Sequence, residues 1–159
     1  MTTAYDFAFR RIDGGKLPLS EFRDKALLVV NVASQCGLTP QYAGLEGLWK
    51  AKRGAGLIVL GVPCNDFGSQ EPGSEDEIKT FCETRFSVDF PMTAKEHVLG
   101  PDAHPLYKWV VGQLGEAAAP GWNFHKYLFA RDGSLAGTFG SRTEPNAPEL
   151  VQAVDEALG

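Results

Sequence analysis

Two short stretches of the chain are apolar at nearly every position, a pattern typical of strands that are covered on both faces of a sheet. They are residues 26–33 (ALLVVNVA) and 57–64 (LIVLGVPC). Between them, apolar side chains recur at helical spacing up to about Arg53. Thr39 and Pro40 are expected to be the N-cap and first residue of this helix. The strand–helix–strand order predicts a parallel pair of strands joined by a right-handed crossover.

The flanking segments predict two hairpins. Residues 5–22 alternate in polarity around the turn Asp13-Gly14-Gly15. Residues 124–130 and 135–139 flank an Asp-Gly turn, which predicts a second antiparallel pair. Added to the parallel pair, these strands predict a mixed sheet.

Three further helices complete the predicted fold. One begins with a capping box at Ser74 and continues to about Phe86, one covers residues 104–114, and the last begins at about Pro148. No repeat, low-complexity tract or long linker interrupts the chain. We therefore predict a single α/β domain over residues 1–159, with a central mixed β-sheet flanked by helices and an N-terminal β-hairpin.

Charge and cysteine usage narrow the function classes. The 159 residues include 15 basic and 20 acidic side chains, a net charge of −5, which argues against a nucleic-acid partner. No stretch approaches the roughly 20 apolar residues of a membrane span, and charges occupy the N-terminal region where a secretory signal would be apolar. The three cysteines form no C-x-x-C pair, so a disulfide-stapled fold and a zinc ribbon are poor interpretations. A reducing, cytoplasmic location is expected.

Cys36 is the leading candidate for chemistry. It follows a buried strand and lies three residues before a predicted helix start, where backbone N–H groups and the helix dipole stabilise a thiolate. The alternative is a small, buried, unreactive side chain. Its position favours reactivity, because ligands approach open α/β sheets at the carboxyl ends of strands.

Three segments together resemble the signature blocks of the glutathione peroxidase family. They are NVASQCGLT (31–39), VPCNDFGSQEPG (62–73) and WNF (122–124), in the family's order and at similar separations. The wider pattern matches from about Tyr5 to Leu158. The resemblance implies a thioredoxin-like fold and the reduction of hydroperoxides by a thiol, without a metal or organic cofactor.

The resemblance also implies site residues. Cys36 takes the place of the cysteine that attacks the peroxide, and Gln70, Trp122 and Asn123 take the family's other three catalytic positions. Such residues suit the chemistry, since neutral amide and indole N–H donors can stabilise the leaving oxygen without quenching the thiolate. Taken singly, Gln70 and Asn123 would be ordinary loop residues and Trp122 a core residue.

Cys82 has two interpretations. Its helical spacing from Ile78 predicts an inward-facing core cysteine. The segment from Ile78 to Pro91 resembles the resolving-cysteine segment of the family's cysteine-type branch, which implies a Cys36–Cys82 disulfide that thioredoxin reduces. Glutathione as direct reductant, and a peroxide sensor or thiol relay, are the alternatives. The compact chain resembles monomeric members that lack the tetramer-forming loop.

Other polar residues are given structural roles. Cys64 is interpreted as structural, and His97, His104 and His125 have no metal-ligand spacing. The acidic cluster Glu71, Glu75, Asp76 and Glu77 is attributed to helix-start electrostatics. Asp66 stands where the family usually has Gln, and a carboxylate pointing at Cys36 would raise the reactive pH range.

Overall fold

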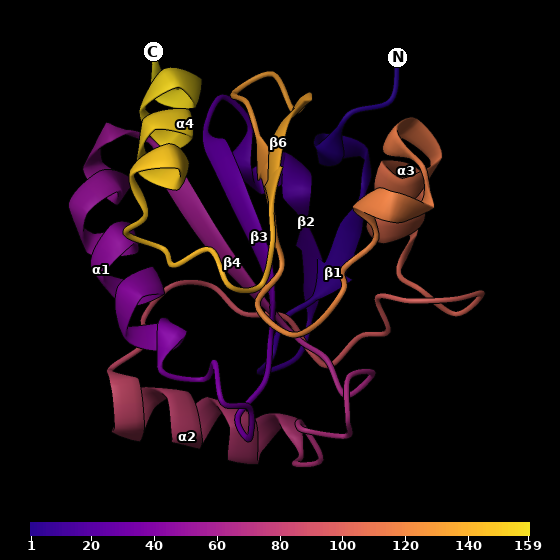
Figure 1. The fold of residues 1–159 in the computed structure, drawn as a ribbon, viewed down its shortest axis with the longest axis vertical. Helices are drawn as coiled ribbons and strands as arrows, with labels where there is room; N and C mark the ends of the chain where they lie inside the picture. The colour runs from indigo at the N-terminus through magenta and orange to yellow at the C-terminus, as the bar shows by residue number, and fades with distance from the viewer.

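The computed structural model describes residues 1–159 and has a four-stranded mixed sheet with helices on both faces (Figure 1). The strands, in the order β4-β3-β5-β6 across the sheet, are β4 (Leu57–Pro63), β3 (Ala26–Val32), β5 (Lys126–Phe129) and β6 (Leu135–Phe139). β3 pairs in parallel with β4 and antiparallel with β5, and β5 and β6 are antiparallel. The predicted parallel pair and the second hairpin are confirmed.

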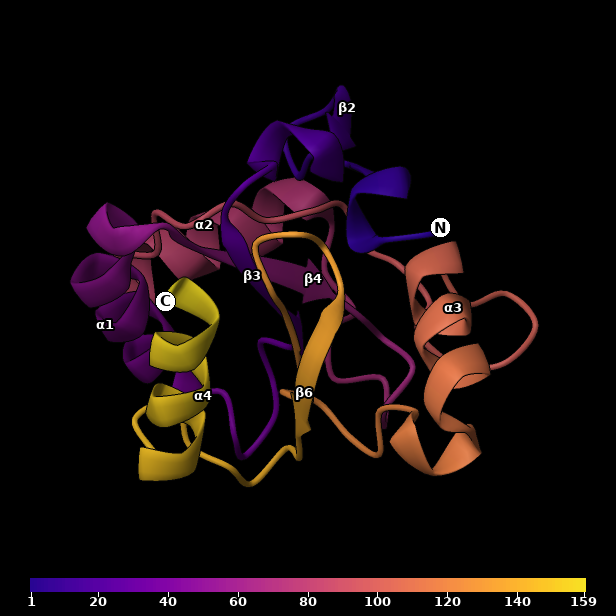
Figure 2. The same cartoon turned by 90° about the horizontal axis from the view of Figure 1, so that it is seen from above.

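The N-terminal hairpin is also confirmed, but it does not extend the central sheet. β1 (Ala8–Arg10) and β2 (Lys16–Pro18) form their own two-stranded antiparallel sheet. Their turn contains Gly14 and Gly15, whose φ angles of 99° and 88° are left-handed and favour glycine. The hairpin closes one end of the molecule, as the view from above shows (Figure 2).

The helices divide between the two faces of the sheet. They are α1 (Gln41–Lys52), α2 (Glu75–Phe86), α3 (Pro105–Leu114) and α4 (Pro148–Leu158). Side chains of β3 alternate, so Leu28 and Val30 pack in one core cluster with α1, α2 and α4. Leu27 and Val29 pack in the other cluster with α3 and the hairpin. None of the helices combines the length and apolar character that crossing a membrane requires.

The loop between β3 and α1 differs in detail from the prediction. α1 begins at Gln41, with Pro40 as its N-cap and no capping side chain. Thr39 therefore does not cap α1. Its hydroxyl donates to Ala33 O (2.8 Å) and accepts from Cys36 N (3.0 Å). Thr39 thus braces the loop that carries Cys36.

α2 runs across the end of the molecule where β3 and β4 terminate (Figure 1). The predicted capping box is present, because Ser74 Oγ accepts from Glu77 N and Glu77 Oε1 accepts from Ser74 N. Only Ile78 and Cys82 of α2 are buried. Phe81 and Phe86 of α2 also pack on the core while half-buried.

Candidate active site

Cys36 lies in the loop between β3 and α1 and is 8% exposed. The backbone N–H of Leu38 donates to Cys36 Sγ over 3.3 Å. The thiol is more buried than the sequence suggested, yet it lines a pocket with Gly37, Leu38, Trp122, Ser141 and Arg142, which gives a small molecule a route to it.

Gln70 and Asn123 are joined directly. Asn123 Nδ2 donates to Gln70 Oε1 over 2.9 Å, and Asn123 is completely buried. This bond fixes the amide of Gln70, so that its Nε2 group remains a free donor. The carbonyl of Gln70 also accepts from Gln35 N over 3.0 Å. The loop that follows β4 is therefore tied to the residue next to Cys36.

Trp122 lines the Cys36 pocket from the loop that precedes β5. Its carbonyl accepts from Asn31 Nδ2 of β3 over 3.0 Å, and its ring packs against Phe67 at 5.7 Å between centroids. Gly68 makes this approach possible, because a Cβ at that position would lie 3.2 Å from Trp122 Cη2 and 3.5 Å from Gln70 Nε2. Gly68 also has a left-handed φ of 67°. The indole remains 38% exposed at the pocket.

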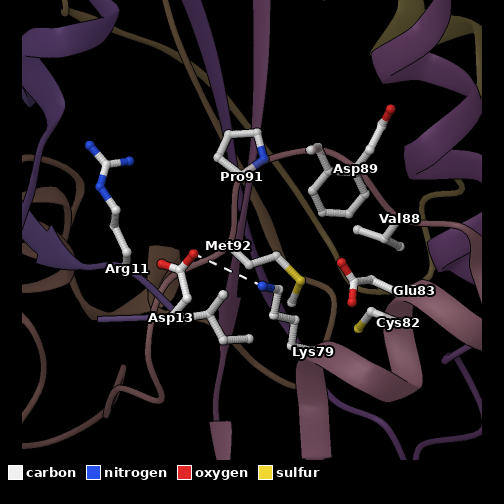
Figure 3. Close-up of a pocket in the computed structure, with 11 residues that line it drawn as sticks. Arg11, Asp13, Lys79, Cys82, Glu83, Val88, Asp89, Pro91 and Met92 are labelled. Carbon is white, nitrogen blue, oxygen red and sulfur yellow. Dashed lines mark ion pairs between the residues drawn. The ribbon is translucent and has the colours of Figure 1, made fainter. Parts of the chain in front are cut away.

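The structure does not bring Cys82 into the Cys36 pocket. Cys82 is 1% exposed on α2, and all three cysteines are free thiols. Burial raises the pKa of Cys82 to about 11, although the nearby Tyr42 hydroxyl acts in the opposite direction. The thiol instead borders a separate hollow between α2 and residues 88–92, where Figure 3 shows it beside Glu83 and Val88.

Asp66 does not disturb Cys36. Its carboxylate lies 2.7 Å from His97 Nδ1 and accepts from the backbone N–H of Val98 over 2.8 Å. Partial burial opposes ionisation, but these hydrogen bonds outweigh it and lower the pKa of Asp66. The carboxylate that stands in place of the usual Gln is therefore bound by His97 and Val98.

Cys64 is completely buried at the end of β4, and burial raises the pKa of its thiol to about 12. An inert, buried thiol of this kind packs as a small apolar side chain. The environment agrees with the structural interpretation of this cysteine.

Glu71 corrects the sequence interpretation of the acidic cluster. Glu75, Asp76 and Glu77 occupy the first turn of α2, but Glu71 is only 1% exposed and lies outside that turn. It lines a pocket between the Cys36 loop and α2, and burial raises its pKa to about 7. The available sequence signal was the capping box at Ser74, which already placed Glu71 before the helix.

A recessed thiol in the loop between a central strand and a helix, with amide and indole donors on the adjoining loops, defines a thiol-dependent redox enzyme. Comparison with known proteins gives the family. The family model for glutathione peroxidase matches residues 4–111. The chain belongs to the glutathione peroxidase family, and its enzyme class is that of a thiol peroxidase.

Individual relatives agree over nearly their whole length. Hydroperoxy fatty acid reductase Gpx2 of Synechocystis sp. is 49% identical over 148 residues, covering 93% of this chain and 94% of the relative. Thioredoxin/glutathione peroxidase BtuE of Escherichia coli is 41% identical, covering 92% of each chain.

Solved structures confirm the thioredoxin-like fold. The structure of T. cruzi GPX1 has a TM-score of 0.78 and 31% identity, covering 99% of this chain and 97% of that one. A thioredoxin-family thiol:disulfide interchange protein from Chlorobium tepidum has a TM-score of 0.72 at 16% identity, covering 99% and 97% of the two chains. The second likeness concerns the fold alone.

Proposed function

We propose that this peroxidase reduces hydrogen peroxide and organic hydroperoxides through Cys36, resolves the product with Cys82, and is returned to the dithiol by thioredoxin. The observation that supports the proposal best is the Asn123–Gln70 hydrogen bond, which holds a neutral donor pair beside the loop of Cys36. The proposed cycle uses five residues of a single chain and can therefore operate in a monomer. They are Cys36, Gln70, Cys82, Trp122 and Asn123.

The first step oxidises Cys36. The thiolate attacks the terminal oxygen of the hydroperoxide, an S–O bond forms and the O–O bond breaks, leaving Cys36 as a sulfenic acid. The departing oxygen takes up a proton and leaves as water or alcohol. The free amide N–H groups of Gln70 and Asn123 and the indole N–H of Trp122 would stabilise the negative charge that develops on this oxygen.

The second step joins the two cysteines. The Cys82 thiol condenses with the sulfenic acid, an S–S bond forms, and the hydroxyl of the sulfenic acid leaves with the thiol proton as water. A disulfide needs Cα atoms roughly 4.4–6.8 Å apart, and Cys82 borders a different hollow from Cys36. We therefore expect α2 to open locally before the disulfide forms.

Several features of α2 favour local opening. Only Ile78 and Cys82 are fully buried, Phe81 and Phe86 pack on the core while half-buried, and a hollow lies beside Cys82. Figure 3 shows Lys79 of α2 facing Asp13 of the hairpin turn, but their charged atoms are 3.9 Å apart and both side chains are exposed. Such a pair contributes about 0–1 kcal/mol. Opening α2 therefore costs little compared with global unfolding.

Thioredoxin is the reductant that the charge of the chain favours. Glutathione is anionic, and a net charge of −5 offers it little long-range attraction. The name of the Escherichia coli relative includes both reductants. Turnover measured with a thioredoxin system and with glutathione, at equal peroxide, separates the two.

The experiment that tests the cycle is Cys82→Ser, with Cys64→Ser as the matched control. After one equivalent of peroxide, mass spectrometry should find a Cys36–Cys82 disulfide in the parent protein and in Cys64→Ser. Cys82→Ser should consume about one equivalent, stop at the sulfenic acid and lose thioredoxin-supported turnover. Hydrogen exchange of residues 74–86 should be faster in the oxidised protein than in the reduced one. Full thioredoxin-dependent turnover by Cys82→Ser would remove the resolving role, and equal exchange in both redox states would remove the opening step.

A further inference from the structure

The loop formed by residues 140–143 is fastened beside Cys36 by a buried polar network. Lys126 is completely buried, and its Nζ donates to Thr143 O (2.6 Å) and to Gln41 Oε1 (2.6 Å). Gln41, the first residue of α1, donates from Nε2 to Ser141 O over 2.7 Å. The backbone on both sides of Arg142 is thus tied to the helix that follows the Cys36 loop.

This anchoring places Arg142 at the pocket of Cys36. The pocket has a volume of about 470 Å³ and is lined by Cys36, Gly37, Leu38, Trp122, Ser141 and Arg142. Arg142 is exposed, is the only charged residue among these six, and makes no hydrogen bond or ion pair with another residue. An unpaired guanidinium is available to an anionic group of a bound molecule, with five N–H donors in a planar fork.

The remaining walls suit an apolar chain. Leu38 is half-buried, and Trp122 is one of three large hydrophobic side chains exposed on the surface, with Met1 and Leu114. A nucleophile, two apolar walls and one unpaired cation match a molecule that combines a hydroperoxide, an alkyl chain and a carboxylate. Hydrogen peroxide uses only the first of these features.

We propose that Arg142 is a specificity-determining residue that selects hydroperoxides carrying a carboxylate, such as a hydroperoxy fatty acid, over uncharged hydroperoxides. The inference rests on the proposed attack by Cys36. The guanidinium binds the carboxylate at the pocket mouth while the alkyl chain lies against Leu38 and Trp122. The bonds that form and break when Cys36 is oxidised are the same for every hydroperoxide, and Arg142 affects only how well the substrate binds.

The test compares linoleic acid hydroperoxide with its methyl ester, in which one methyl group removes the carboxylate charge. Both are kept below micelle-forming concentrations. The rate of Cys36 oxidation is followed in a single turnover without any reductant, so that an effect of Arg142 on anionic glutathione cannot contribute. Arg142→Gln removes the charge at the pocket. Arg23→Gln is the control, because Arg23 is also exposed but packs over the ring of Tyr5 rather than at the pocket.

In Arg142→Gln we expect the acid-to-ester ratio of second-order rate constants to fall about two- to fivefold, the size expected for one solvent-exposed ion pair. The fall should come from a higher half-saturating concentration of the acid and should shrink in the parent protein as ionic strength rises. Arg142→Glu should lower the ratio further, and Arg23→Gln should leave it unchanged. A ratio that is the same in the parent protein and Arg142→Gln would overturn the inference. If the parent protein oxidised Cys36 with neither substrate, the proposed function itself would fail.

Discussion

Cys36 and Cys82 are 8% and 1% exposed, so burial alone hardly distinguishes them. Their neighbours do. Cys36 Sγ accepts a backbone N–H from Leu38 and borders an open pocket with Trp122. Cys82 lies within a helix, where burial raises its pKa to about 11 and the nearby Tyr42 hydroxyl acts in the opposite direction. A backbone donor and access to a pocket therefore distinguish Cys36 from Cys82, whose thiol is held as a core side chain.

The largest expected effect on activity comes from replacing Cys36. Cys36→Ser should abolish peroxide reduction while leaving the fold intact, because a serine hydroxyl is a far weaker nucleophile at neutral pH. Peroxide consumption and circular dichroism, measured on the same preparation, check both parts. Peroxide reduction by a folded Cys36→Ser protein would contradict the assignment of the nucleophile.

The next largest effect is expected at the three proposed donors beside the Cys36 loop, which are Gln70, Trp122 and Asn123. Gln70→Ala and Asn123→Ala should each lower the second-order rate of Cys36 oxidation by up to about a hundred- to thousandfold, the loss seen for one donor in acyl-transfer sites. Trp122→Phe should lower it less. The double variant should lose less than the product of the single effects, because Gln70 and Asn123 hydrogen-bond to each other.

Gln35→Ala is the control for this series, because Gln35 adjoins Cys36 but its side chain is exposed and forms no hydrogen bond. Its oxidation rate should match that of the parent protein. Unchanged rates in all three donor variants would leave Gln70, Trp122 and Asn123 as scaffold residues.

The stability of the protein is expected to depend on pH through Glu71, which lines a pocket together with residues of the helix that carries Cys82. Burial raises the pKa of Glu71 from 4.5 to about 7, and Ile78 and Phe81 of α2 line the same pocket as this residue. Unfolding or opening lets Glu71 ionise, so the folded state is favoured below about pH 4.5 and loses stability as the pH rises toward about 7, with no further loss above it. The slope cannot exceed about 1.4 kcal/mol per pH unit.

Glu71→Gln tests this dependence, because the amide keeps the shape of the carboxyl but does not titrate. Denaturant unfolding at several pH values between 5 and 8 should give the parent protein a steeper fall in unfolding free energy than Glu71→Gln over the lower part of this range, about pH 5 to 7. Hydrogen exchange of α2 should follow the same trend. Parallel unfolding curves would show that Glu71 does not contribute to the pH dependence of stability, and parallel exchange rates would show the same for the opening of α2.

The smallest effect on activity is expected at Cys64, a buried thiol without a proposed reaction. Cys64→Ser should leave turnover nearly unchanged, although burying a hydroxyl there is expected to cost about 1–3 kcal/mol of unfolding free energy. Turnover at a temperature where the variant remains folded checks the first part, and denaturant unfolding checks the second. A large loss of turnover without loss of stability would give Cys64 a role in the reaction.

The amino-acid sequence by itself determined the elements and the chemistry. The apolar runs that become β3 and β4, the capping box at Ser74 and the helical spacing in α1 are local patterns, and each produced the expected element. The motif around Cys36 likewise indicated a thiol peroxidase. The predicted N-cap of α1 was wrong, since Thr39 braces the Cys36 loop instead of capping the helix.

Only the tertiary structure decided which distant residues share an environment. It separated Cys82 from the Cys36 pocket, buried Glu71, and bound Asp66 to His97. It also brought Arg142 to the pocket through the buried Lys126 and Gln41. Burial, pKa and charge pairing depend on neighbours in space that lie far apart along the chain, and the periodicity of side chains carries no record of these neighbours.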